Sequence, residues 1–246
     1  MWTRAELKTQ GKAAFKLNYW KSVGAAFLLT LLSGITTFGA RSSTSSTSTG
    51  TEGTDLEALA QQFNNLTEEQ KKDLVIVLVA IMGVIAIIGI ISVLLKSFVF
   101  NPLQLGCFAF FNNNVKNPPA PLDTVGMGFR NYGHTFATFL LRDLYLVLWS
   151  LLFVIPGIVK AYSYRMVPYI MAENPELSAN ETITRSREMM NGHKWNAFLL
   201  DLSFIGWYLL GVLTLNLLNV FWTNPYKENT DAALYQALSR GDTRQY

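Results

Sequence analysis

Several charged side chains lie inside apolar segments of this chain. At 1.5 Å per helical residue, Arg142 and Asp143 fall about 12 Å into one apolar run, Asp201 about 9 Å into another, and Arg165 about 10 Å from the end of a third. An unpaired charge at such a depth is costly, so ionisable groups there usually face one another or a wet cavity. We expect Arg165 to pair with Asp143 or Asp201.

These residue types permit ion pairing, ligand binding or proton transfer. Lys227, Glu228 and Asp231 extend the set, and we expect an inner polar vestibule that binds or moves a small ligand or an anionic lipid headgroup. The competing interpretation is a set of structural ion pairs in a membrane scaffold. A second alternative is an enzyme acting on lipid, with Asp143, Asp201 or Asp231 as acid or base. The sequence contains no GxSxG, HExxH, Walker loop or dinucleotide fingerprint, so we expect no catalytic residues.

Metal and disulfide chemistry also find little support. Cys107 is the only cysteine, which excludes an internal disulfide and makes a thiolate metal cluster implausible, and we expect it in the core. His134 and His193 are better explained by headgroup contacts than by a metal site, and no cofactor is expected. Four acids are interpreted as a solvated helix face: Glu173, Glu176, Glu181 and Glu188.

The composition predicts a membrane protein. Of 246 residues, 50% are hydrophobic and 15% are charged, whereas about 25% charged is typical of soluble domains. The apolar residues form runs near the length of about 20 residues that a helix needs to cross a bilayer. These runs are 74–95, 136–155 and 197–220, together with the shorter run 23–32, which lies inside an expected span at 19–39. The net charge of +3 fits an anionic inner leaflet, so lipid headgroups and not nucleic acid are the expected partners.

The distribution of charge predicts the orientation. Five cations precede the first apolar run, whereas 41–73 holds three cations and six acids. Lys and Arg are retained on the cytoplasmic side, so the N-terminus should be inside and 41–73 outside. Segment 41–73 begins with a Ser/Thr-rich stretch that we interpret as a flexible insertion. The Asn- and Pro-rich segment 112–121 predicts a loop.

Three short motifs indicate an internal repeat. Each has Asn followed three residues later by a cationic or imidazole side chain: Asn18 with Lys21, Asn131 with His134, and Asn191 with Lys194. Each motif follows a helical segment and precedes an apolar run, and each returning arm contains a proline: Pro102, Pro168 and Pro225. The sequence therefore predicts one domain, 1–246, with repeats 1–112, 122–174 and 178–240.

The predicted fold is all-α: a polytopic bundle of about six membrane helices in three hairpins, with interfacial amphipathic helices and both termini cytoplasmic. The spans are 19–39, 74–98, 135–155, 157–173, 195–213 and 217–237. The three prolines are expected to bend helices, either around a cavity or only for packing. In the alternative to a sixth span, the fifth is one long helix and the C-terminus lies outside.

Cations outside the vestibule are expected near headgroups. Lys160 follows a predicted outer turn at Pro156 and Gly157, so we interpret it mainly as an anchor at the outer surface. Segment 178–191 begins with a capping box and should be a helix along the inner surface. Arg185, Arg187 and Lys194 would then meet anionic lipid.

A family resemblance covers nearly the whole chain. It rests on IPGIVKAYSYRMVPYIMAENPELSANETITRSREMMNGHKWNAFLLDLSFIGWYLLG and on RAELKTQGKAAFKLNYWKS near the N-terminus. These segments resemble the bacterial multi-pass membrane family catalogued as domain of unknown function 975. The chain departs from the family in the Ser/Thr stretch and at TLNLLNVFWTNPY, where relatives tend to be richer in glycine. The resemblance implies a bacterial plasma membrane protein and no established activity, so it assigns no catalytic residue.

Overall fold

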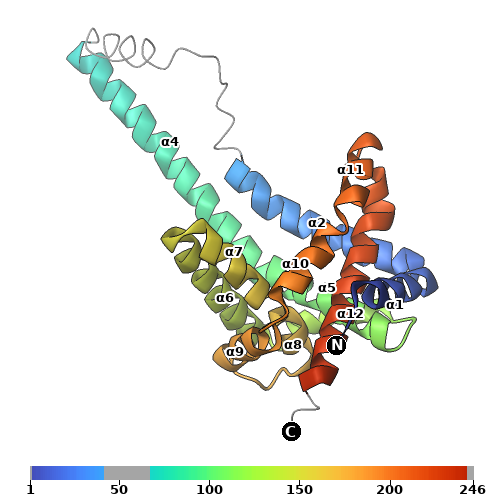
Figure 1. Ribbon diagram of the computed structural model, residues 1–246. Helices are drawn as coiled ribbons and strands as arrows, with labels where there is room; N and C mark the ends of the chain where they lie inside the picture. The colour runs from blue at the N-terminus through green and yellow to red at the C-terminus, as the bar shows by residue number, and fades with distance from the viewer. Residues whose placement is uncertain (1, 42–66, 243–246) are drawn as a thin grey trace. The chain divides into compact units, whose positions relative to one another are not determined.

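The computed structural model describes residues 2–41 and 67–242, and every element in those two ranges is a helix (Figure 1). The prediction of an all-α protein is thereby confirmed. Most of the expected outer insertion, residues 42–66, lies outside the described residues.

The elements follow in chain order as α1 (Arg4–Leu17), α2 (Tyr19–Arg41), α4 (Glu68–Leu95), the π-helix η1 (Lys96–Phe100), α5 (Asn101–Lys116), the 3₁₀-helix η2 (Leu122–Phe129), α6 (Tyr132–Leu152), α7 (Val154–Ser163), α8 (Val167–Glu173), α9 (Ala179–Met189), α10 (Lys194–Leu202), α11 (Ile205–Leu213), the π-helix η3 (Asn219–Thr223) and α12 (Asn224–Asp242).

The chain forms two compact units. One is Ile35–Lys96, and the other combines Met1–Gly34 with Ser97–Tyr246. Helix α4 makes up most of the described part of the first unit, and none of the residues in its most apolar window, with a mean hydropathy of 3.4, is buried. A helix that is apolar on every side suits a lipid environment.

Three described helical segments are long and apolar enough to cross a membrane: Glu68–Ser92, Tyr132–Leu152 and Lys194–Leu213. The apolar helix Tyr19–Leu32 is shorter. These segments support a membrane protein. Several predicted spans are interrupted, because 157–173 is divided between α7 and α8, 195–213 between α10 and α11, and 217–237 between η3 and α12. Asn229, Thr230 and Asp231 of α12 are buried against protein.

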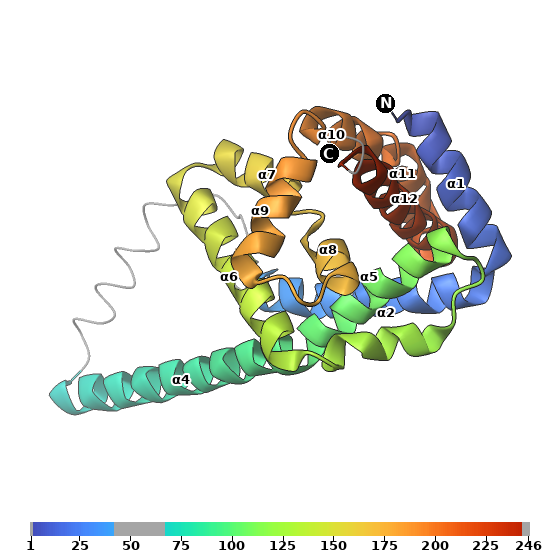
Figure 2. The same cartoon turned by 90° about the horizontal axis from the view of Figure 1, so that it is seen from below.

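Helices α5, α8 and α12 form the centre of the larger unit. Helix α5 packs against α8, α12 and η2, while α12 also lies along α1 (Figure 1). Helices α6 and α7 form a hairpin that contacts α9 (Figure 2). The core includes Tyr169 of α8 stacked on Tyr235 of α12, with ring centroids 5.3 Å apart. Phe110 and Phe111 of α5 are fully buried beside them.

Pro102, Pro168 and Pro225 each lie just after an irregularity in their arm. Pro168 is the second residue of α8, which follows a turn at 164–166, and proline is tolerated in a first turn because its missing N–H would find no intrahelical acceptor there. Pro102 and Pro225 lie within continuous helical runs, shortly after the π-helical turns η1 and η3. That the three prolines bend their helices stays a prediction.

The three Asn motifs lie where a short helix meets the next apolar helix. Asn18 ends α1, Asn131 precedes α6, and Asn191 lies in the turn between α9 and α10. Their environments differ, because Asn18 is buried while Asn131 and Asn191 are exposed. The shared sequence pattern thus marks a shared position along the chain and not one set of contacts.

Helix α1 approaches the backbone of α12 closely. A Cβ added at Gly11 would lie 2.7 Å from the backbone nitrogen of Thr230. Glycine is required here because any larger residue would push the two helices apart. The buried face of α1, formed by Leu7, Ala14 and Phe15, depends on this approach.

We therefore predict that Gly11→Ala lowers the melting temperature in detergent, although alanine favours a helix by about 1 kcal/mol over glycine. Gly24→Ala in α2 is the matched control, because no atom lies within 4 Å of a Cβ added there. Gly24→Ala should leave the melting temperature unchanged or raise it slightly. Equal melting temperatures for the two variants would contradict the close approach.

Candidate functional site

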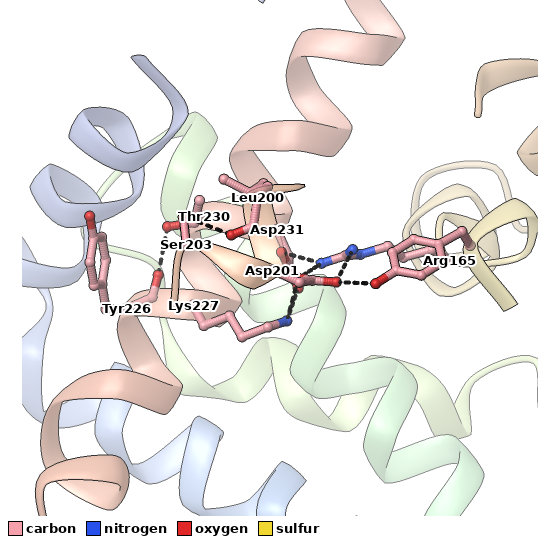
Figure 3. A network of polar contacts seen from close by, with 9 residues as sticks. Arg165, Leu200, Asp201, Ser203, Tyr226, Lys227, Thr230 and Asp231 are labelled. Atoms are coloured by element: carbon pink, nitrogen blue, oxygen red, sulfur yellow. Dashed lines mark hydrogen bonds and ion pairs between the residues drawn. The ribbon is translucent and has the colours of Figure 1, made fainter. Parts of the chain in front are cut away.

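Arg165 lies between two carboxylates from different helices. It occupies the turn between α7 and α8 and donates two hydrogen bonds of 2.8 Å to the two oxygens of Asp201 on α10. Its Nη2 also donates to Asp231 on α12 at 2.7 Å (Figure 3). The Arg165 side chain is 14% exposed. A two-pronged arginine–carboxylate pair is among the stronger polar contacts in proteins.

Lys227 contacts the same two carboxylates. Its amine donates to Asp231 at 2.8 Å and lies 3.4 Å from Asp201 (Figure 3). Each of two cations therefore contacts each of two acids, and we call Arg165, Asp201, Lys227 and Asp231 the ion-pair network. Tyr162 of α7 completes the surroundings of Asp201 by donating its hydroxyl at 2.9 Å.

Local structure explains how these side chains meet. Lys227 and Asp231 are four residues apart, so they lie on one face of α12. Asp201 lies in the last turn of α10, which ends at Leu202 before α11 starts at Ile205. Arg165 projects from a turn whose neighbours, Tyr164 and Met166, are buried. Three separate segments thus contribute to one charged cluster.

The sequence expectation for Arg165 named two possible partners, and the structure pairs it with Asp201. Arg142 and Asp143 instead pair with each other on α6, with Asp143 accepting at 3.0 and 2.8 Å. The Arg142 guanidinium also lies 4.5 Å from the centroid of the Phe139 ring. Glu228 lies within electrostatic reach of Lys227 and Asp231 on α12.

A second polar cluster, centred on Asn114, was missed by the sequence analysis. Asn114 donates to the backbone carbonyl of Ala14 and to Asn229, and it accepts a 2.8 Å hydrogen bond from Asn18. The Asn side chains are buried and neutral. The run of Asn residues was interpreted as a loop, but α5 continues to Lys116 because these amides are bonded inside the protein. The helical conformation of these Asn residues could be predicted only if their hydrogen-bond partners, which are distant in sequence, were known.

Glu173 does not belong to a solvated face. It accepts hydrogen bonds from Asn112 of α5 at 2.7 Å and from Tyr235 of α12 at 2.8 Å, and it also pairs with Lys116. Glu173 is the last residue of α8, so it joins the ends of three helices. Glu176, Glu181 and Glu188 are exposed, as expected. In the predicted capping box, the hydrogen bonds from Ser178 lower the pKa of Glu181.

Lys160 lies with cations that the sequence analysis placed on the opposite surface. It lines a pocket together with Arg187 of α9 and Lys194 of α10. The depth estimate assumed a straight descending helix, but the chain breaks after α7 and α9 packs back against it. Ser186 of α9 donates to the backbone carbonyl of Ser163 at 2.8 Å. Lys160 therefore lies beside α9 and not at the opposite end of the bundle from it.

The remaining expectations concern a thiol and two imidazoles. Cys107 is fully buried in α5, as expected, and burial raises the pKa of its thiol to about 12. His134 lies near the Thr138 hydroxyl in α6, and the His193 ring packs against Trp2 at 5.9 Å. In the described residues, no group of three or more His, Cys, Asp or Glu side chains has a metal-binding arrangement.

Comparison with known protein families identifies the C-terminal part of the chain. Residues 151–242 match the model of a family described as "Protein of unknown function (DUF975)". The C-terminal part of the chain is therefore similar to the DUF975 family. The matched segment contains all four residues of the ion-pair network. Comparisons with curated proteins and with solved structures give no match.

The network makes Arg165 a strong candidate for mutation. Arg165→Ala leaves Asp201 and Asp231 without their shared guanidinium, and we predict a loss of about 3 kcal/mol of stability, the lower end for breaking a buried pair. A detergent melting curve measures it. Arg142→Ala is the matched control, because the hydrogen bonds between Arg142 and Asp143 stay within α6.

Arg142→Ala should lower the melting temperature clearly less than Arg165→Ala does. If Arg142→Ala lowers the melting temperature as much as Arg165→Ala does, the hydrogen bonds between helices do not account for the stability that Arg165 contributes. Arg165→Lys should recover part of the loss, because it keeps the charge but not the two-pronged geometry.

Proposed function

We propose that this protein belongs to the DUF975 family and is a non-enzymatic, multi-pass protein of a bacterial plasma membrane that serves as a membrane scaffold. The observation that carries the proposal is the ion-pair network, in which both cations contact both acids. A site that recognises a charged ligand keeps at least one charge available for that ligand. Here the four charges neutralise one another, so the network is suited to holding the α7–α8 arm, α10 and α12 together.

The apolar surface supports the same role. Helix α4 is apolar along most of its length, and Leu151, Phe153, Leu213 and Leu215 are exposed at the turns between α6 and α7 and between α11 and η3. Such surfaces are suited to lipid or to the helices of other membrane proteins. A scaffold needs a rigid interior and accessible apolar flanks, and these features support both.

We propose six membrane crossings with both termini cytoplasmic. The fourth and sixth crossings are the broken arms α7–α8 and η3–α12, whose polar backbone and side chains are covered by protein. Irregular backbone is tolerated at membrane depth where it is buried in protein. A periplasmic-type reporter fused after Tyr246 should be inactive. Activity of that reporter would show an odd number of crossings.

Passage of a small ligand is the second candidate, and the helix breaks favour it. Arg165 lies in the break between α7 and α8, and Asp201 lies just before the break between α10 and α11. Broken helices surround binding sites in many transporters, where the freed backbone contacts substrate or ions. On this proposal the network opens when its ligand enters.

A double-mutant cycle separates the two candidates. Arg165→Gln and Asp201→Asn each leave charged partners unbalanced, whereas the double variant restores neutrality. For a lock, the double variant should be more stable than the sum of the single effects allows. It should also retain the lipids and protein partners that native mass spectrometry finds on the unaltered protein.

The opposite result would favour passage. A double variant that folds with unaltered stability but loses a bound small molecule would overturn the scaffold proposal. Lys71→Gln is a suitable control, because Lys71 pairs only three residues away on the same exposed turn of α4.

A further inference from the structure

A pocket of about 260 Å³ lies outside the ion-pair network, between α7, α9 and the start of α10. Three of its lining residues are cations: Lys160, Arg187 and Lys194. Glu188 is the one acid in the lining, so the pocket carries an excess of positive charge. None of the four residues has an ion pair with another side chain in the described part of the chain.

Like charges repel at short range, so three cations around one cavity raise the free energy of the empty pocket. An anion that enters relieves this repulsion. Lys160 has only weak compensation, because its amine lies over the ring of Trp149, 4.5 Å from the centroid. The geometry therefore favours a negatively charged occupant.

Neutral polar groups complete the lining. Thr184 and Asn191 also line the pocket and carry hydroxyl and amide groups, and the lining residue Ser163 is buried, with its hydroxyl bonded to the Val159 carbonyl. Lys194 is also the first residue of α10, where backbone N–H groups lack intrahelical acceptors. Several donors around a small volume suit an anion with several oxygens, and Arg and Lys are the side chains that bind phosphate most often.

Exposed apolar side chains lie close in sequence to two of the lining cations, on the same helices. Ile158 and Val159 of α7 are 53% and 45% exposed, and Trp195, next to Lys194, is 67% exposed. A molecule with a phosphate group and hydrocarbon chains can therefore satisfy both surfaces together. A free phosphate would use only the polar part.

We propose that the pocket formed by Lys160, Arg187 and Lys194 binds a phosphate group, supplied by the headgroup of an anionic membrane lipid. The phosphate lies among the three cations, while the acyl chains follow the apolar flank of α7. The pocket shares no residue with the ion-pair network. A result that contradicts the scaffold role would therefore not bear on phosphate binding, and a result that contradicts phosphate binding would not bear on the scaffold role.

Thermal unfolding of the full chain in a neutral detergent tests the site. The probes are dihexanoyl phosphatidylglycerol, dihexanoyl phosphatidylcholine and inorganic phosphate, each titrated at constant ionic strength. We expect phosphatidylglycerol to raise the melting temperature most. Phosphatidylcholine should act weakly because its choline cation offsets the phosphate charge.

Arg187→Gln and Lys194→Gln are the diagnostic variants. Each should raise the apparent Kd for phosphatidylglycerol about fivefold, and the double variant about 30-fold, if each cation near a lipid surface contributes about 1 kcal/mol. Arg130→Gln is the matched control, because Arg130 is an exposed arginine at the end of η2 and does not line the pocket. Its apparent Kd should equal that of the unaltered chain.

The outcomes are distinct. If inorganic phosphate stabilises the protein as well as phosphatidylglycerol does, and the double variant loses both effects, the anion site stands and free phosphate is its source. If neither anion has an effect, or the double variant responds like the control, the proposal is overturned. Should a glutamine variant fail to fold, Lys160→Gln provides the same measurement from another helix.

Discussion

Charge neutralisation inside a low-dielectric bundle is the constraint on which this structure depends. Two charges 4 Å apart interact several times more strongly in a protein interior than in water, and an isolated buried charge is correspondingly unfavourable. Arg165 therefore has to lie where acids from α10 and α12 can reach it. The break between α7 and α8 is what gives its side chain that position. The packing of these helices, the positions of their breaks and the positions of the charges therefore depend on one another.

The neutral clusters follow the same logic with weaker interactions. Asn114 joins α1 and α12 to α5 through amide hydrogen bonds and reaches the Ser22 hydroxyl of α2, and Glu173 joins the ends of α5, α8 and α12. Both clusters replace water with protein partners for groups that would be costly to bury alone. Because each cluster joins several helices, the polar residues specify which helices become neighbours.

How much could be predicted from the sequence depended on the range of the interaction. The all-α class, the burial of Cys107 and the capping box at Ser178 follow from composition or from residues a few positions apart. The contact between Arg165 and Asp201 was within reach because both were counted to a similar depth. The role of Asn114 was not, since loop-forming residues and buried amide bonds look alike until the partner is known. The expected separation of Lys160 from α9 was wrong because a straight helix was assumed where α7 ends and α9 folds back.

The close contact between α1 and α12 has a consequence for the order in which the chain can fold. Gly11 of α1 is made long before Thr230, the residue against which it packs. The face of α1 that holds Leu7, Ala14 and Phe15 therefore remains without its α12 partner while the intervening helices are made. Because an amphipathic helix with an uncovered apolar face binds readily at a bilayer surface, the membrane itself can cover α1 until α12 arrives. The pairing of α1 with α12 thus comes late in the folding of this unit.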